Sequence, residues 1–304
     1  MIRLGVYLRG MSMGAADLVP GVSGGTMALI TGVYEELIDT LGGLGFHHLG
    51  ILRRQGPVAA WRAANLTFLV SLLAGVATSV AVLSRLISWL LSAHPVPVWA
   101  FFCGLILASI ALVVKPLRKH GMPQLLALLV GIVAAIAVAL APGMDTADAP
   151  VWVFFASGAI AICAMILPGI SGSFILLLLG MYQPVLDAVT AGRYLPLLAF
   201  VAGCAVGLLS FVHLLRWLLH HYHDTLMSLL AGFMGGSLLA LWPWREGGEH
   251  GQRGDWLSPA HYAQLTGGDA QIGLAIAMMA VGLISVWLLY RAAPVHNVAE
   301  RVSP

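Results

Sequence analysis

Long, almost uncharged segments alternate with short polar ones along this chain. A helix that spans a bilayer needs about 20 consecutive, mostly apolar residues. Six segments approach that length, and they cover residues 66–91, 96–114, 123–141, 195–219, 224–242 and 271–290. The polar stretches between them are no longer than loops. The pattern therefore predicts an all-α integral membrane protein with about six transmembrane helices in a single membrane domain, residues 1–304.

Composition supports this class. Hydrophobic residues make up 60% of the chain and charged residues 9%, whereas a soluble domain has about 25% charged residues. The three cysteines all lie inside apolar segments, and the histidines show no metal-binding spacing such as HExxH. We therefore expect no metal, no cofactor and no nucleic-acid partner, and we expect the bilayer to surround the chain.

A proline–glycine motif occurs twice, at a spacing of 148 residues. It reads Pro20-Gly21-Val22-Ser23-Gly24 near the start and Pro168-Gly169-Ile170-Ser171-Gly172 later. In both copies a GxY triplet follows after seven further residues. A multi-residue match that recurs in the same order indicates an internal duplication.

A second set of matches extends the duplication. Trp89-Leu90-Leu91 corresponds to Trp217-Leu218-Leu219 at an offset of 128, and Gly104 corresponds to Gly232. The offset is smaller because the first half carries a longer polar loop, near residues 42–65. We therefore divide the chain into a first repeat, 1–142, and a second repeat, 151–291. The third apolar segments of the two repeats align only by position.

Each motif interrupts an apolar region, so we predict that it breaks a helix. Proline and glycine free backbone N–H and C=O groups, and the hydrocarbon layer tolerates such groups only inside protein or beside a wet cavity. We predict two re-entrant hairpins, at 14–38 and 151–186, with Pro20 and Pro168 at the breaks. Kinks that serve only packing are the simpler interpretation. Paired breaks in both halves of a membrane protein are, however, typical of a transport site.

The distribution of charge favours inverted halves. Three spans separate the motifs, so re-entrant hairpins invert the second half, whereas motifs that span leave the halves parallel. Inversion gives eleven basic residues on the cytoplasmic side and four outside, as the positive-inside rule requires. The first set is Arg3, Arg9, Arg53, Arg54, Arg62, Lys115, Arg118, Lys119, Arg216, Arg291 and Arg301, and the second is Arg85, Arg193, Arg245 and Arg253. We therefore predict an inverted repeat with both termini in the cytoplasm, although residues 151–167 are also long enough for a short span.

Residues 14–26, GAADLVPGVSGGT, with Arg9 before them and GVYEELI at 32–38 after them, resemble the bacterial polyprenyl-phosphate transporter family. LPGISGS at 167–173 and the stretch from Gly236 to Trp244 fit the same family. The resemblance implies that the chain moves undecaprenyl phosphate across the bacterial cytoplasmic membrane and so recycles the lipid carrier of cell-envelope synthesis. The implied partner is a polyprenyl phosphate lipid.

A lipid phosphate needs N–H donors, hydroxyl groups and a cation, and the two motifs offer these groups. The helix that starts after each break would direct N–H groups and the positive end of its dipole at the anion. The candidate phosphate-binding residues are Arg9, Gly21, Ser23, Gly24, Gly25, Thr26, Gly169, Ser171, Gly172 and Ser173. The alternative for each serine or threonine is a helix cap.

Asp17 is an acidic residue close before the first break, and its counterpart in the second repeat is Met165. An ionisable group at membrane depth is by default a functional candidate. Asp17 and, at the membrane edge, Glu35 are therefore candidates for proton or ion coupling. The alternatives for Asp17 are a helix cap and an ion pair with Arg9.

Two other functions stay open. The GxSG pattern at Gly21–Gly24 and Gly169–Gly172 is also found in intramembrane serine hydrolases. A serine nucleophile needs a base, however, and His213 alone cannot serve two duplicated serines. A secondary transporter of a small anion or an amino acid would use the same broken helices. We expect a transporter and no enzyme.

Overall fold

The computed structural model describes residues 3–19, 23–45, 47–115, 117, 121–141, 149–245 and 256–292. In these residues the regular structure is helical, apart from an isolated bridge between Arg245 and Trp256. Four of the described helices are long and apolar enough to cross a membrane, or up to five if a bent helix pair counts as one span. The predicted all-α, multi-pass class is confirmed, and the number of spans stays a prediction.

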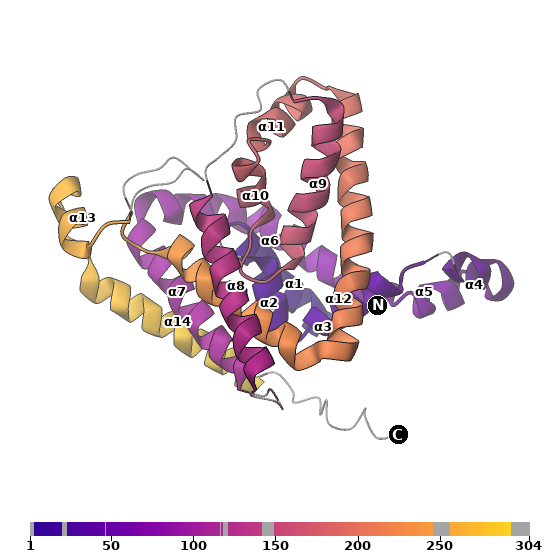
Figure 1. The fold of residues 1–304 in the computed structure, drawn as a ribbon, viewed down its shortest axis with the longest axis horizontal. Helices are drawn as coiled ribbons and strands as arrows, with labels where there is room; N and C mark the ends of the chain where they lie inside the picture. The colour runs from indigo at the N-terminus through magenta and orange to yellow at the C-terminus, as the bar shows by residue number, and fades with distance from the viewer. Residues whose placement is uncertain are drawn as a thin grey trace.

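The described helices of the first half belong to the helical bundle in Figure 1, apart from α4 and α5, which project from it. In chain order they are α1 (Leu4–Asp17), α2 (Gly24–Ile30), α3 (Tyr34–Gly43), α4 (His47–Gln55), α5 (Pro57–Ala63), α6 (Leu66–Ala93), α7 (Pro95–Val114) and α8 (Met122–Leu140). The second half adds α9 (Val151–Ile166), α10 (Gly172–Leu178), α11 (Tyr182–Thr190), α12 (Tyr194–Ser237), the 3₁₀ helix η1 (Leu238–Leu241), α13 (Pro259–Thr266) and α14 (Ile272–Ala292).

Helix bounds repeat the offset seen in the sequence. α2 begins at Gly24 and α10 at Gly172, and each is 7 residues long. The next helices, α3 and α11, begin at Tyr34 and Tyr182. α12 bends at Tyr222, whose φ of −135° and ψ of 40° are not helical. This long helix therefore carries two of the predicted apolar segments, one on each side of its bend.

Glycines bring α1 against α6 and α9 against α12. A β-carbon at Gly75 would overlap the carbonyl oxygen of Tyr7, and one at Gly203 would overlap that of Phe155. Small residues let membrane helices approach this closely, and Cα–H···O contacts then add to the packing. At the offsets of 128 and 148, Gly203 is the counterpart of Gly75, and Phe155 is the counterpart of Tyr7. A second matching pair is Gly10 against Leu72 and Gly158 against Phe200.

The later helices are exchanged between the halves. α7 packs against α14, and α8 packs against the part of α12 that follows the bend. Gly104 of α7 touches the carbonyl group of Met279, and Gly232 of α12 touches that of Leu128. Because Gly232 is the counterpart of Gly104, Met279 is the counterpart of Leu128, at an offset of 279 − 128 = 151. The contact thus aligns the third segments, which the sequence aligned only by position.

The main core lies where these helices cross. Its fully buried side chains come from both halves and include Ile38 of α3, Phe68 of α6, Ile106 of α7 and Met234 of α12. Large apolar side chains such as Leu126 on α8 stay exposed on the outside. Apolar surface of this extent is typical of contact with lipid.

Candidate functional site

α1 and α2 form the first hairpin, and both of its ends lie on one side of the molecule. Nη1 of Arg3, which precedes α1, is 3.5 Å from Oε1 of Glu36 in the first turn of α3. The backbone N–H of Arg3 also donates to Oγ of Ser71, near the start of α6. The chain therefore runs inward along α1, turns at the break and runs back along α2. The start of α1 and the start of α3, which follows α2, lie at the same side of the protein.

The first break is closed by its own side chains. Oδ1 of Asp17 accepts a 2.6 Å hydrogen bond from the N–H of Gly24. Oγ of Ser23, the N-cap of α2, accepts a 3.1 Å bond from the N–H of Gly25. Asp17 thus caps the helix, and a carboxylate suits the positive end of its dipole. Pro20 and Gly21 lie outside the described residues.

The two breaks meet inside the protein. The hydroxyl group of Ser23 lies 3.3 Å from the carbonyl oxygens of Met165 and Leu167, to which it can donate. Oγ1 of Thr26 accepts a 3.0 Å bond from the N–H of Gly169, which has a φ of +85° that favours glycine. Both hydroxyl-bearing side chains are buried. The regions of the two breaks, whose motifs lie 148 residues apart in the sequence, are therefore in direct contact.

The second break is more open than the first. Oγ of Ser171 and Oγ of Ser173 share a 2.9 Å hydrogen bond, and Ser173 is exposed. Ser171 is the N-cap residue of α10, but its side chain makes no capping bond. Pro168 is buried at the turn, and a β-carbon at Gly172 would lie 2.8 Å from the carbonyl oxygen of Ala161. The N-terminus of α10 therefore lacks the side-chain acceptors that close α2.

Arg9 lies apart from the breaks. It is half-buried in α1, two turns before Asp17, which is about 12 Å along the helix axis. No carboxylate in the described part of the chain lies within ion-pair distance of its guanidinium. The ion pair with Asp17, one of the two alternatives that the sequence left open for that residue, is therefore not formed. Arg9 lies between the breaks and the side on which α1 begins.

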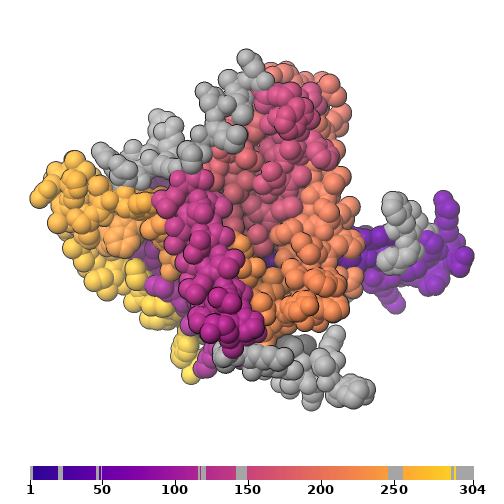
Figure 2. All heavy atoms as spheres, in the orientation of Figure 1, coloured from indigo at the N-terminus to yellow at the C-terminus, as the bar shows by residue number. Residues whose placement is uncertain are grey.

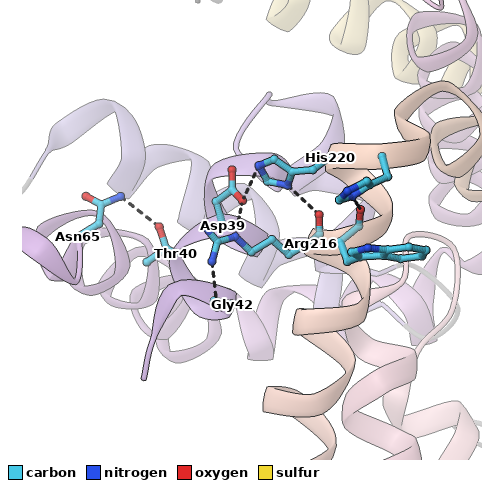
Figure 3. Close-up of polar contacts among 8 residues, drawn as sticks. Asp39, Thr40, Gly42, Asn65, Arg216 and His220 are labelled. Atoms are coloured by element: carbon cyan, nitrogen blue, oxygen red, sulfur yellow. Dashed lines mark hydrogen bonds and ion pairs between the residues drawn. The ribbon is translucent and has the colours of Figure 1, made fainter. Parts of the chain in front are cut away.

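A polar cluster joins α3 to the bend of α12 (Figure 3). Nε of Arg216 is 3.1 Å from Oδ1 of Asp39, and Nη1 donates to the carbonyl oxygen of Gly42 at 3.2 Å. Nε2 of His220 lies 3.7 Å from the same carboxylate oxygen. The sequence interpretation missed this contact. The signal that could have indicated it is a shared spacing of four residues. Acidic residues stand at 35 and 39 in α3, and basic residues stand at 216 and 220 in α12.

Glu35 belongs to this α3–α12 polar cluster, at the molecule's edge and away from the breaks. Oε1 of Glu35 accepts a 3.0 Å hydrogen bond from Nε2 of His223, which lies just after the bend of α12 and outside the spanning parts. The hydrogen bond from His223 lowers the pKa of Glu35. The bond to Glu35, with the second one to Asp224, raises the pKa of His223 above its ordinary value of 6.5. The nearby His220 also lowers the pKa of Glu35.

We expect the Glu35–His223 pair to make stability depend on pH. The contribution of protonated His223 is complete below 6.5 and is lost as the pH rises through its higher folded pKa. That of Glu35 is complete above 4.5 and is lost as the pH falls through its lower folded pKa. The wild type should therefore be more stable than His223→Gln, with a higher Tm, and the difference should be largest between pH 4.5 and 6.5. The gain in the free energy of unfolding should be no more than about 1 kcal/mol, since the pair is half-exposed.

Thermal unfolding in detergent across a pH series measures this difference. His213→Gln is the matched control, because the ring of His213 bonds to the carbonyl oxygen of Leu209 in its own helix. A Tm difference for His223→Gln that persists unchanged in mildly alkaline buffer would rule out the ion pair as its cause.

Thr26→Val is expected to destabilise the contact between the breaks. Valine keeps the shape of threonine but leaves the buried N–H of Gly169 without an acceptor, at a cost of about 1–3 kcal/mol. Thr26→Ser should retain most of the stability, because it keeps the hydroxyl group. Thr31→Val is the control: Thr31 is also buried, but it donates to the carbonyl oxygen of Met27 at the end of its own helix. Equal unfolding midpoints for Thr26→Val and Thr31→Val would contradict the contact.

The geometry gives no support to a serine hydrolase. The described partners of the Ser23 hydroxyl group are two carbonyl oxygens and a backbone N–H, and that of Ser171 is another hydroxyl group. None of these is a general base. His213 is exposed on α12 and is bonded to its own helix.

Known proteins resemble this chain over most of its length. The sequence model of a family described as undecaprenyl phosphate translocase-like matches residues 13–254, which include both breaks. The chain is 45% identical over 294 residues to a polyprenyl-phosphate transporter of Vibrio cholerae, covering 92% of this chain and 94% of that protein. It is 33% identical over 259 residues to a polyprenyl-phosphate transporter of Staphylococcus aureus, covering 78% of this chain and 85% of that protein. No solved structure matches it.

Proposed function

This chain belongs to the undecaprenyl phosphate translocase-like family, and we propose that it moves a polyprenyl phosphate from one leaflet of the membrane to the other. The observation that carries the proposal is the direct contact between two broken helices, one from each half of the chain. In secondary transporters, paired broken helices hold the substrate near the bilayer midplane, where the halves meet. A lipid phosphate fits such a site because only its head group has to pass through the protein.

The proposed architecture is an inverted repeat with six spans and two re-entrant hairpins. The repeats are 1–142 and 151–291, and the spans are α6, α7, α8, the two parts of α12, and α14. Two findings support inversion: the hairpins meet at their tips, and α11 lies near the top of the view in Figure 1 whereas α3 lies in the lower half of the bundle. The matching glycine contacts support the duplication. We place both termini in the cytoplasm and the protein in the bacterial cytoplasmic membrane.

Cysteine labelling tests this topology. In a variant without Cys103, Cys163 and Cys204, a cysteine at position 121 should react with a membrane-impermeant reagent from the cytoplasm. One at position 194 should react from outside, since Tyr194 is 77% exposed at the start of α12. Reaction of both positions from the same side would eliminate the inverted repeat.

The proposed path of the phosphate group has two stages. Arg9, a half-buried cation without a described carboxylate partner, meets the head group on the side where α1 begins. Ser171, Gly172 and Ser173 then provide hydroxyl groups and N–H donors at the open second break. The corresponding groups of the first break are already hydrogen-bonded within the protein. Asp17 accepts from the N–H of Gly24, Ser23 from that of Gly25, and Thr26 from that of Gly169. Those groups and Gly21 would contact phosphate only after the tips separate.

Asp17 and Glu35 are the proposed candidates for coupling to protons or another ion. Asp17 is the candidate closest to the path, because its carboxylate holds an N–H that a phosphate group would also use. Glu35 is bound in the α3–α12 polar cluster, so any role in coupling would act through that cluster. No reaction step is assigned to either residue, because we propose a transporter and no enzyme.

Purified protein in liposomes tests the function. Labelled undecaprenyl phosphate is supplied in one leaflet, and its appearance in the other is followed with an impermeant reagent. The protein should accelerate transfer over protein-free liposomes. Uptake of free phosphate or an amino acid without lipid transfer would favour the small-substrate transporter, and trapping of Ser23 or Ser171 by a serine-reactive phosphonate would favour the hydrolase.

A further inference from the structure

The helix pair α4–α5 has no counterpart in the second half. In the first half it stands between α3 and α6, whereas only residues 191–193 separate α11 from α12. Figures 1 and 2 show the pair projecting from the side of the helical bundle. The pair therefore adds a surface to the duplicated fold, and nothing in the proposed transport path uses it.

The charge of this surface is of one sign. Arg53, Arg54 and Arg62 are exposed, and they form no ion pair with a carboxylate of the described residues. The sequence has no Asp or Glu between Asp39 and Asp145, so α4 and α5 themselves carry no acidic side chain. The nearby carboxylate of Glu36 is already bonded to Arg3 and Asn65. The unpaired arginines therefore favour an anionic partner at this surface.

Large apolar side chains accompany the arginines. Val58 is 64% exposed, Trp61 45% and Leu52 44%. Val58, Trp61 and Arg62 have the i, i+3, i+4 spacing that places them on one face of α5. A helix with apolar and basic residues on its exposed face is typical of a segment that lies in the membrane interface.

The structure also fixes α5 at the level where a spanning helix begins. Nε1 of Trp61 donates to Oγ1 of Thr67 in the first turn of α6, at 2.9 Å. Asn65, with a left-handed φ of 47°, turns the chain from α5 into α6. Its side chain donates to Glu36 and Thr40 of α3. Because α6 enters the hydrocarbon layer from this point, α5 lies beside the lipid head groups.

We infer that α4 and α5 lie on the membrane and bind anionic lipid head groups through Arg53, Arg54 and Arg62. Val58 and Trp61 then reach the boundary between head groups and acyl chains, and the arginines extend their guanidinium groups to the phosphates. The bound lipid is a bulk anionic lipid of the leaflet from which α6 starts. The inference needs only that α6 spans the bilayer and does not depend on the transported substrate.

A nitroxide label tests the inference in the full chain. It is placed at position 58 in a variant without the three native cysteines, and the protein is reconstituted into nanodiscs of phosphatidylcholine with or without phosphatidylglycerol. Electron paramagnetic resonance then compares collisions with oxygen, which enters lipid, and with a water-soluble nickel complex. Position 265 on α13 is the matched control, because Leu265 is 53% exposed on a helix that carries no Lys or Arg.

With phosphatidylglycerol, position 58 should gain access to oxygen and lose access to nickel, and position 265 should not change. Arg53→Gln, Arg54→Gln and Arg62→Gln should each lower the lipid-inserted population roughly fivefold. An unchanged Tm shows that these variants are folded. Nickel access that is the same in both nanodiscs would overturn the inference.

Discussion

Gly203→Leu is expected to abolish the folded protein, and Gly75→Leu should do the same. At both positions the new side chain would meet the backbone of the facing helix: the carbonyl oxygen of Phe155 for Gly203, and that of Tyr7 for Gly75. Overpacking usually costs about 1–3 kcal/mol because neighbouring side chains move aside. A carbonyl group in a helix cannot move without displacing the whole helix. Either substitution would therefore push a hairpin helix, α9 or α1, away from its spanning partner.

Monodispersity in detergent and thermal unfolding measure the effect. Gly5→Leu on α1 and Gly273→Leu on α14 are the controls, because nothing lies within 4 Å of a β-carbon at either position. The controls should elute and unfold like the wild type, whereas the Gly203 and Gly75 variants should aggregate. A monodisperse Gly203→Leu protein with a wild-type Tm would show that α9 and α12 are not packed as described.

The local sequence was sufficient to predict the breaks and the class of the protein. Apolar segments of membrane length and the repeated PGxSG motif each depend only on neighbouring residues, and the helices after the motifs begin where the offset of 148 predicts. The exchange of α7, α8, α12 and α14 between the halves was not predicted. It depends on which helices pack together, and the positions of Gly104 and Gly232 in the sequence do not indicate which helix packs against each of them.

The repeated motif also could not predict that the two breaks differ. Ser23 and Ser171 occupy the same position in identical patterns, yet only Ser23 makes a capping bond. The difference comes from tertiary contacts: Asp17 reaches across its own break, and the second break offers its carbonyl oxygens to Ser23. One part of the difference was visible in the sequence: the counterpart of Asp17 is Met165, which has no carboxylate to cap the second break.

Arg9→Ala is expected to weaken the binding of undecaprenyl phosphate by roughly tenfold to a hundredfold. A charge-assisted hydrogen bond to phosphate contributes about 1.5–3 kcal/mol. Arg9 has no carboxylate partner in the described residues, so its charge remains available to a ligand. Arg9→Lys should keep part of the affinity, because it retains the charge but loses the planar guanidinium fork. Binding of labelled undecaprenyl phosphate to the detergent-solubilised variants measures the change.

The second break needs a different substitution. Gly172→Leu is a poor probe, because even a β-carbon there would lie 2.8 Å from the carbonyl oxygen of Ala161 and disturb packing. The double variant Ser171→Ala/Ser173→Ala removes two hydroxyl groups without adding volume, and it should weaken binding less than Arg9→Ala because the N–H groups remain. Arg193→Ala, at the residue that precedes α12 and outside both breaks, is the control for general loss of charge. Equal affinity of the wild type, Arg9→Ala and the double-serine variant would place the phosphate elsewhere, and the breaks would then serve packing alone.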